Sequence, residues 1–345
     1  MLRKNLNIGT RFGEELLKRP VNTMNLFPIY SISSILSPPG PHQSSNQVND
    51  NLEKQIKKQN PYSFLKESKN VGSFTNRDKH LPLPKEIALS FSGAGTLGLY
   101  HYGVVHCLQT YSPQLMSRVT KFAGTSVGSV VATFLALDEQ LFDESIKLFL
   151  DVSQELNELT FGALTPGFSM HEKLILLADK ILPDKIEFRL KKVYISMTKA
   201  ETNENILLDE FKTKKDLIAA ISASCYIPGW SANYFTPRPS INGVTYIDGG
   251  YTNNLPIFPG IETITISPFS SKATISPSNS SIFAPYFPVQ VTIGNQAINA
   301  NLANVSRAAS ALFPPNVESL KQYYDTGFKD AFLYLFESGR LERPP

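Results

Sequence analysis

The stretch KFAGTSVGSVVATFLAL, residues 121–137, combines three local signals in a fixed order. Its first residues continue an apolar run that is typical of a buried strand, and its last residues are apolar enough to form a buried helix. Between them, Gly124 and Gly128 flank Ser126 in a Gly-x-Ser-x-Gly pattern, which is typical of a sharp strand-to-helix turn. The stretch therefore predicts a strand, a tight turn and a helix, a unit that α/β proteins repeat.

A serine on such a turn is a candidate nucleophile, and it needs a base to take its proton. The pattern also occurs by chance, so the partner decides between a catalytic serine and an ordinary turn. Five histidines are present: His42, His80, His101, His106 and His171. Only His171 follows Ser126, and no strand-end acid between them would complete a triad in the order serine, acid, histidine. The other four lie in a polar N-terminal region or on a predicted helix, so the sequence favours a base other than histidine.

The stretch TYIDGGYTNNLP, residues 245–256, offers a carboxylate instead. Asp248 stands at the end of an apolar strand and directly precedes Gly249 and Gly250, so we expect its side chain at the rim where the strand-end loops meet. A carboxylate is a weak base for a serine hydroxyl, because its ordinary pKa is about 3.9, but burial raises that pKa. The alternative is that Asp-Gly-Gly is simply a turn.

A glycine-rich loop, SGAGTLG at residues 92–98, follows one predicted strand and opens a helix. Its backbone amides should converge at a helix N-terminus, where negative charge is favoured. In one interpretation they stabilise the oxyanion that forms when a hydroxyl attacks an ester carbonyl. A nucleotide-binding loop would instead need an acidic residue about 20 positions later, and the corresponding SPQLMSRVTKF, residues 112–122, contains none. A third alternative is that the glycines only allow close helix packing.

From Leu83 onward, apolar strands alternate with helical stretches, which predicts a single α/β domain over residues 84–340 with a mainly parallel sheet sandwiched by helices. The expected strands are residues 86–92, 119–124, 243–250 and 262–269, with two more joined by a polar turn within 191–211. The expected helices are residues 97–111, 129–138, 139–155, 171–181, 214–227 and 316–339.

Residues 1–83 differ in composition from the rest of the chain. They are rich in Ser, Asn, Gln, Pro and Lys, which predicts a mostly disordered extension. Within them, residues 1–20 carry apolar residues four apart and several basic residues, a pattern found in amphipathic surface helices and in mitochondrial presequences. Glu14 and Glu15 argue against the presequence, and no continuous apolar segment predicts a secretory signal.

Composition narrows the classes of protein further. The formal net charge is +3, and the chain carries no nucleic-acid signature. Cys107 and Cys225 are far apart and have no histidine cluster nearby, so neither a disulfide framework nor a zinc site is expected. The longest mainly apolar run is much shorter than the roughly 20 residues that span a bilayer. We therefore expect an intracellular protein, cytoplasmic or peripheral to a membrane or lipid droplet, that does not cross the membrane.

Three short segments together resemble the motifs of the patatin-like phospholipases. They are GAGTLG at 93–98, GTSVG at 124–128 and DGG at 248–250. The wider similarity covers about residues 86–336, includes SASCYIPGW and YYDTGFKDAFLYL, and looks most like the adiponutrin and adipose triglyceride lipase branch. This branch would be a lipid-metabolising member of the α/β class that the alternation of strands and helices predicts.

The resemblance implies a role for each motif. Ser126 would be the nucleophile and Asp248 the general base of a catalytic dyad. The backbone amides of the loop would form the oxyanion hole, from Gly93, Ala94, Gly95, Thr96, Leu97 and Gly98. Plant-type members often carry a basic residue in this loop, whereas this chain has Thr96 and Leu97, so charge assistance from the loop is not expected.

The same resemblance implies a lipolytic acyl hydrolase that cleaves fatty-acyl esters of phospholipids or neutral glycerides and needs no metal or organic cofactor. Its expected partners are a glycerolipid substrate and the surface of a membrane or lipid droplet. A lipid acyltransferase and a non-catalytic membrane-binding or droplet-binding protein are the alternatives on the same fold. Residues that could line an acyl pocket or its lid, although such residues are more often core or surface, are Phe161, Leu164, Phe168, Tyr226 and Trp230.

Overall fold

A computed structural model describes residues 83–186, 192–233, 235–278 and 289–342. All of them fall within one unit of the chain, residues 46–345. The predicted extension, with its expected amphipathic helix at residues 1–20, lies outside the described residues. The domain boundary near residue 83 therefore stays a prediction.

Four parallel strands form the centre of the sheet, in the order β3–β2–β1–β7. Their bounds are Ile87–Phe91 for β1, Val119–Thr125 for β2, Val193–Lys199 for β3 and Glu262–Ile266 for β7. Parallel strands bring their carboxyl ends to one edge of a sheet. The glycine loop leaves the end of β1, and Ser126 follows the end of β2, so both begin at that edge. The predicted mainly parallel α/β sheet is confirmed.

Antiparallel strands extend the sheet on the β3 side. Both β4 (Asn205–Leu208) and β6 (Val244–Asp248) pair with β3, and β5 (Ser240–Ile241) pairs with β6. A separate hairpin consists of β8 (Gln290–Ile293) and β9 (Gln296–Asn299). Neither β5 nor this hairpin was predicted from the sequence, because these short segments show no clear period-two pattern.

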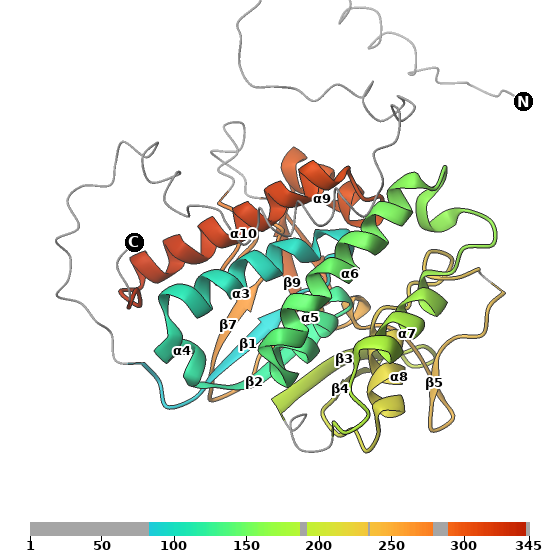
Figure 1. Ribbon diagram of the computed structural model, residues 1–345, viewed down its shortest axis with the longest axis horizontal. Coiled ribbons are helices and arrows are strands. Elements are labelled where there is room, and N and C mark those ends of the chain that lie inside the picture. The colour runs from blue at the N-terminus through green and yellow to red at the C-terminus, as the bar shows by residue number, and fades with distance from the viewer. Residues whose placement is uncertain (1–82, 187–191, 234, 279–288, 343–345) are drawn as a thin grey trace, which may run out of the picture. The chain divides into compact units, whose positions relative to one another are not determined.

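Helices pack against the sheet and against one another (Figure 1). Their bounds are Leu99–Tyr111 for α3, Pro113–Ser117 for α4, Val127–Leu137 for α5, Glu139–Glu158 for α6, Met170–Ile181 for α7, Lys214–Ser224 for α8, Leu302–Leu312 for α9 and Val317–Glu337 for α10. Each predicted helix is present, whereas α4 and α9 were not predicted. A signal for α9 existed, because Asn301 caps the helix by accepting a hydrogen bond from the Asn304 amide.

The strand residues alternate between the two faces of the sheet, as a period of two requires. In β1, Ile87 and Leu89 join the main apolar core, to which helices α3, α5, α8 and α10 also contribute. Ala88 points to the other face, where it clusters with Ala123 and with Phe258 from the segment between β6 and β7. The β1 strand is buried throughout its length, which is typical of a central strand in a parallel sheet.

The C-terminal helix α10 lies along α3 (Figure 1), and two glycines allow the close approach. A Cβ placed on Gly103 would lie 2.0 Å from the carbonyl oxygen of Tyr324, and one placed on Gly327 would lie 2.1 Å from that of Tyr100. Both distances are far inside van der Waals contact. The two backbones therefore pack directly against each other at this crossing.

Candidate active site

Ser126 occupies the sharp turn between β2 and α5 that the Gly-x-Ser-x-Gly pattern predicts. Its backbone has φ 53° and ψ −130°, a conformation that residues with a side chain rarely adopt. Neighbouring chain segments leave no room for side chains at the two glycines. A Cβ on Gly124 would lie 2.1 Å from Gly128 O, and one on Gly128 would lie 2.3 Å from Phe91 O. The two glycines of the Gly-x-Ser-x-Gly pattern are therefore required because backbone atoms pack closely against both positions.

Hydrogen bonds hold this strained turn in place. The Ser126 amide donates to the hydroxyl of Ser224 at the end of α8 (2.9 Å), and that hydroxyl donates to the carbonyl oxygen of Ser196 in β3 (2.7 Å). The Ser129 hydroxyl donates back to the Ser126 carbonyl oxygen (2.6 Å). Strain at a functional residue persists only where the surroundings over-determine the backbone. Here three different elements supply that restraint.

Asp248 reaches the neighbourhood of Ser126 by a route that differs from the one expected. We expected its side chain at the rim where the strand-end loops meet, and the direction of its strand was left open; β6 runs antiparallel to β3. Asp248 is level with Met197, and Ser196 next to it is level with Thr125 of β2. Gly249 is needed here because a Cβ would lie 2.2 Å from Ser196 O. Strand register, and not a shared carboxyl edge, positions the carboxylate.

The Asp248 carboxylate is buried and only partly hydrogen-bonded. Its Oδ1 accepts from the Gly250 amide at 2.7 Å, whereas its Oδ2 has no hydrogen-bond partner of normal length among the described residues. Burial raises the pKa of Asp248 to about 6, against the opposing effects of the Gly250 amide and the nearby Ser126 hydroxyl. A buried carboxylate with a free oxygen and a raised pKa is a stronger base than an exposed one.

The amides of the glycine loop are not equivalent. The Gly93 amide already donates to Asn254 Oδ1 (3.1 Å), and the Leu97 amide donates to Ala94 O (3.1 Å). Gly95 and Thr96 open a 3-10 turn, Gly95–Gly98, where N–H groups lack an intrahelical acceptor, and both border the same cavity as Ser126. Among the six residues predicted for an oxyanion hole, Gly95 and Thr96 are the two that border this cavity.

The C-terminal part of the chain supports the loop from outside. Gly95 has φ 53°, and a Cβ there would lie 2.1 Å from Ala311 O of α9. The Thr96 hydroxyl donates to the carbonyl oxygen of Ser310 in the same helix. The unpredicted helix α9 therefore helps to shape the loop.

Asn254 links the glycine loop to the Asp-Gly-Gly turn, a role that the sequence analysis missed. Its Oδ1 accepts from the Gly93 amide, and its Nδ2 donates to Gln296 Oε1 of β9 at 2.7 Å. A Cβ on Gly250 would lie 3.1 Å from the same Oδ1, so the amide sits directly against the turn. Asn254 and Gln296 are both buried. The signal for Asn254 was its place six residues after Asp248 in the quoted motif.

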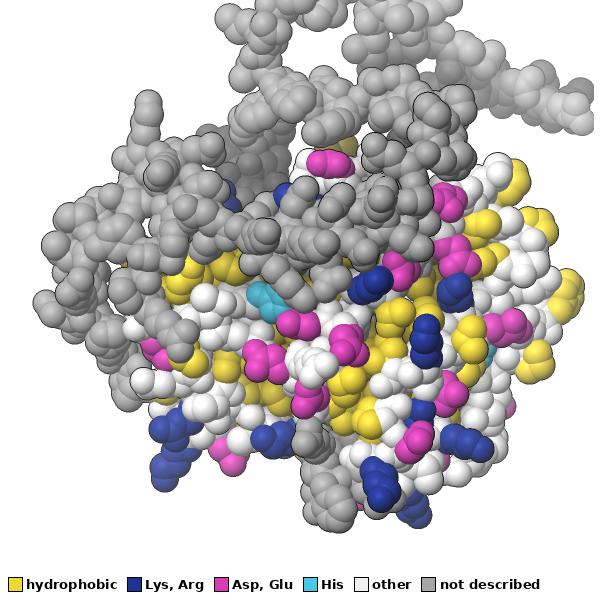
Figure 2. Space-filling model, viewed as in Figure 1, with side chains coloured by type: hydrophobic (Ala, Val, Ile, Leu, Met, Phe, Trp, Pro, Cys, Tyr) yellow, Lys and Arg dark blue, Asp and Glu magenta, His cyan; other side chains and the backbone are white. Residues whose placement is uncertain are grey.

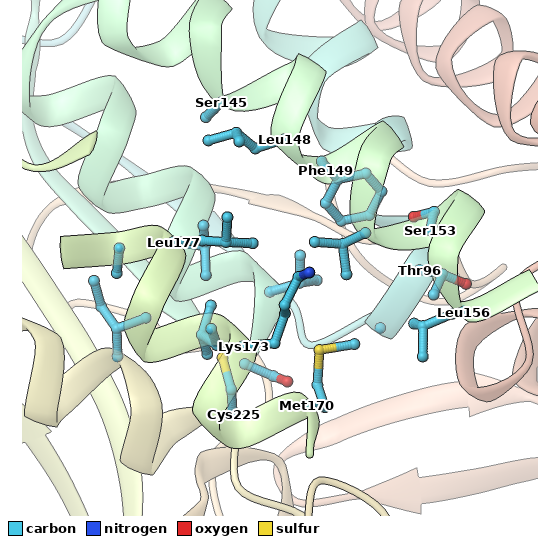
Figure 3. A pocket seen from close by; sticks show the side chains of 18 of the residues that line it. Thr96, Ser145, Leu148, Phe149, Ser153, Leu156, Met170, Lys173, Leu177 and Cys225 are labelled. Carbon is cyan, nitrogen blue, oxygen red and sulfur yellow. The ribbon is translucent and has the colours of Figure 1, made fainter. Parts of the chain in front are cut away.

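An apolar cavity opens at Ser126 and extends between α5, α6 and α7. Figure 3 shows side chains of α6 and α7, among them Phe149 and Leu177, converging on this space. The apolar residues that line it are Val127, Val130, Phe134, Leu148, Phe149, Val152, Leu156, Met170, Leu174, Leu177, Ala178, Ile181, Ile221 and Trp230. The polar lining is small, and its ammonium group, from Lys173, is paired with Glu155 at 2.5 Å. Such a cavity suits a hydrocarbon chain.

Of the aromatic and apolar residues predicted for an acyl pocket or lid, only Trp230 lines this cavity. Tyr226 is buried, and its hydroxyl donates to Thr236 O at 3.2 Å. Phe161 and Leu164 are exposed on the surface. The cavity wall consists mainly of residues of α5, α6 and α7, none of which was predicted from the sequence to line an acyl pocket.

Each of the three described histidines has another environment. His101 is fully buried, its Nε2 bonds to Ser92 O at 3.0 Å, and burial lowers its pKa to about 4, so the ring is neutral. His106 bonds to Tyr324 and to Asp143. His171 stacks edge-on against the Tyr226 ring, and burial lowers its pKa. These contacts agree with the prediction that histidine is not the base.

Cys225 also lies beside Ser126 and lines the cavity. Burial raises the pKa of its thiol, and the charge of Asp248 raises it further. A thiol in this state is protonated and does not compete with Ser126 as a nucleophile. Within the described ranges, no group of three or more His, Cys, Asp or Glu residues is arranged to hold a metal ion. Within the same ranges, no helix has the length and apolar character that a bilayer span requires.

Comparison with known proteins identifies the family. The family model described as "Patatin-like phospholipase" matches residues 89–261, which include the glycine loop, Ser126 and Asp248. The chain is 35% identical over 259 residues to human "Patatin-like phospholipase domain-containing protein 4", covering 75% of this chain and 100% of the relative. The α/β fold with its strained serine turn and the sequence similarity along most of the domain therefore agree. The chain belongs to the patatin-like phospholipase family.

Other relatives differ in what their names say they do. The chain is 36% identical over 264 residues to "Patatin-like phospholipase domain-containing protein 2" of Bos taurus, covering 76% of this chain and 53% of the relative. It is 32% identical over 258 residues to "1-acylglycerol-3-phosphate O-acyltransferase Pnpla3" of Mus musculus, covering 74% of this chain and 60% of the relative. The chain thus spans between half and two thirds of these two longer proteins.

Proposed function

We propose that this protein is a serine acyl hydrolase that cleaves fatty-acyl esters of glycerolipids with Ser126 as nucleophile and Asp248 as general base. The family supports lipid chemistry, and the apolar cavity at Ser126 supports a long acyl chain as the bound group. The observation that carries the proposal is the Asp248 carboxylate. It is buried, and one of its oxygens has no hydrogen-bond partner of normal length. It also lies close enough to Ser126 for the serine hydroxyl to lower its pKa.

In the first step, Asp248 takes the proton of Ser126 while Oγ attacks the ester carbonyl carbon. The carbonyl oxygen gains the negative charge and is stabilised by the amides of Gly95 and Thr96. Collapse of this intermediate breaks the bond to the glycerol oxygen, which leaves with the proton from Asp248 and yields an acyl-enzyme. In the second step, Asp248 activates a water molecule, which releases the fatty acid and restores Ser126.

Labelling with an active-site fluorophosphonate tests the nucleophile directly. We expect stoichiometric modification of Ser126 in the wild-type chain and none in Ser126→Ala, with parallel loss of short-chain ester hydrolysis. The Ser153→Ala variant is a matched control, because Ser153 carries another buried hydroxyl that lines the same cavity but lies on α6, away from the turn. A folded wild-type chain that resists labelling would favour a non-catalytic lipid-binding protein over an enzyme.

Acyl transfer is the second candidate, and the name of the mouse relative, an O-acyltransferase, favours it. The acyl-enzyme is common to both reactions, which differ only in whether water or a lipid hydroxyl attacks it. Product analysis with a labelled phospholipid or triglyceride, in the presence and absence of a lysophospholipid or monoglyceride acceptor, separates them. Free fatty acid in both conditions supports hydrolysis, whereas label in the acceptor lipid supports transfer.

A further inference from the structure

Three segments that are distant in the sequence meet beside the apolar cavity. The side-chain amide of Asn157, at the end of α6, donates to Pro314 O at 2.8 Å, and the Trp230 indole N–H donates to Leu312 O at 3.2 Å. A Cβ on Gly162 would lie 3.5 Å from the Phe313 ring. The segment after α6, the loop after α8 and the end of α9 are therefore in contact.

These segments continue into the cavity. Leu156 of α6, Met170 of α7 and Trp230 border the same space as Ser126. The segment that joins α6 to α7 thus runs from one part of the cavity wall to another.

Large apolar side chains point outward from the same segments. The exposed fractions are 63% for Phe161, 51% for Leu164, 49% for Phe313 and 38% for Leu312. Figure 2 shows hydrophobic side chains along the edge of the molecule where Figure 1 places the connection between α6 and α7. We define the apolar rim as Phe161, Leu164, Trp230, Leu312 and Phe313. Exposed apolar residues that gather at a cavity mouth mark an interaction site.

The rim is also free of charge. Residues 159–170, 226–237 and 308–315 contain no Asp, Glu, Lys or Arg, although such residues make up 18% of the chain. The ammonium group of Lys173, which lines the cavity, is already paired with Glu155. The rim therefore offers neither a cationic patch for anionic head groups nor charges for an oppositely charged protein.

We infer that the apolar rim is the face by which this protein adsorbs to a lipid surface with neutral, zwitterionic head groups. The inference rests on the proposed function, since the acyl chain would pass from that surface into the cavity. A protein partner seated on the rim would block the cavity mouth, whereas a lipid surface fills it with substrate. Aromatic side chains such as Trp230 suit the boundary between head groups and acyl chains.

Adsorption can be measured without catalysis by using the full-length Ser126→Ala chain and vesicles of pure phosphatidylcholine. Trp230 is the only tryptophan in the sequence, so its fluorescence reports on the rim directly. We expect a blue shift on adding vesicles and co-sedimentation of the chain with them. The Trp230 blue shift should change by less than about twofold when a quarter of the lipid is anionic or when salt is raised tenfold, because the three rim segments carry no charged side chain.

A rim variant and a matched control locate the surface. Phe161→Ser with Phe313→Ser removes two exposed aromatic rings and should weaken vesicle binding by at least about tenfold. Leu176→Ser with Ile257→Ser removes two apolar side chains that are at least as exposed, 66% and 63%, and that lie outside the three rim segments, so it should leave binding unchanged. Circular dichroism and thermal melting check that both variants are folded.

The outcomes separate the inference from the proposed function. With Ser126 restored, the rim variant should hydrolyse a water-soluble short-chain ester at the wild-type rate but lose activity on vesicles. Equal vesicle binding by the rim and control variants, a requirement for anionic lipid, or loss of binding at high salt would each overturn the lipid-facing rim. Inactivity of the wild-type chain on the soluble ester would instead count against the proposed hydrolase and leave the binding result standing.

Discussion

At the scale of single residues, the site combines a strained backbone with a buried carboxylate, and both reduce the free energy of unfolding. Ser126 has a positive φ, and Asp248 is buried with one oxygen that lacks a hydrogen bond. Each feature is unfavourable in a fold that only needs to be stable. Together they hold a hydroxyl and a raised-pKa carboxylate close to each other, which is the arrangement that proton transfer needs.

The Asp248 carboxylate should reduce stability at neutral pH. Its folded pKa of about 6 exceeds the ordinary value, so between about pH 4 and pH 6 the unfolded chain ionises first and stability falls as pH rises. The difference of roughly two pKa units corresponds to about 3 kcal/mol above pH 6. Asp248→Asn keeps the acceptor for the Gly250 amide and removes the buried charge. We expect it to be more stable than the wild type at pH 7.5 and equal to it near pH 4, in urea unfolding followed by circular dichroism.

The same pKa predicts the acid side of the activity profile. Asp248 acts as a base only when ionised, so kcat/KM for a short-chain ester should rise with pH through about 6 and then level off. The Asp248→Asn protein should lose activity by orders of magnitude at every pH. A wild-type profile that stays flat between pH 4.5 and pH 7.5 would contradict the role of Asp248 as the base.

At the scale of elements, the site depends on how loops are joined. The glycine loop, the Asp-Gly-Gly turn and β9 meet through Asn254, which bonds to the Gly93 amide and to Gln296. None of these elements adjoins another in sequence. Asn254 therefore holds the proposed oxyanion donors at a set distance from the proposed base.

Replacing Asn254 should affect catalysis more than substrate binding. Asn254→Ala leaves the Gly93 amide without its acceptor and Gln296 Oε1 without its donor, at a cost of roughly 2–4 kcal/mol in stability. We expect kcat to fall by about tenfold or more while KM changes little, because the displaced loop acts on the transition state. Gln296→Leu leaves the bond from the Gly93 amide to Asn254 in place and should have the smaller effect on kcat. Equal losses in both variants, or a change confined to KM, would argue for a merely structural role.

At the scale of the whole molecule, the C-terminal helix completes the fold from the far end of the chain. Helix α10 packs on α3, which follows the glycine loop, and α9 contacts that loop directly through Gly95 and Thr96. The last described residues also contact the first part of the domain. The Glu342 carboxylate accepts hydrogen bonds from the Gln114 and Leu115 amides at the start of α4. Distant parts of the chain thus stabilise the N-terminal half of the site.

The α3–α10 crossing should therefore be sensitive to a single methyl group. In Gly103→Ala the new Cβ would lie 2.0 Å from Tyr324 O, a backbone atom that cannot rotate away. We expect the free energy of unfolding to fall by about 3 kcal/mol, which is the upper end of the usual effect of overpacking. Gly167→Ala is a suitable control, since no atom lies within 4 Å of its Cβ position, although its φ of 84° adds local strain. Urea unfolding of both variants checks the difference, and equal destabilisation would contradict the packing argument.

The strands and helices around Ser126 were predictable because their signals are local. Apolar runs, a glycine on each side of the serine and polar turns identified β1, β2, α5 and most other elements. The location of Asp248 was predicted only in part. Its strand was recognised, but the antiparallel pairing with β3 was not, because period and composition do not specify the direction of a neighbouring strand. The short hairpin of β8 and β9 lacked any local signal of comparable strength.

The sequence by itself determined the α/β class, the strained serine turn and the absence of a suitable histidine, because each depends on residues that are close together in the chain or on a simple count. Only the tertiary structure decided which side chains meet Ser126. Gly93 and Asn254 are 161 residues apart, and the cavity wall is assembled from three helices whose apolar faces resemble ordinary core in the sequence. Such contacts arise from strand register and helix packing, which depend on the whole chain, so the burial that raises the pKa of Asp248 could not be read before the chain was folded.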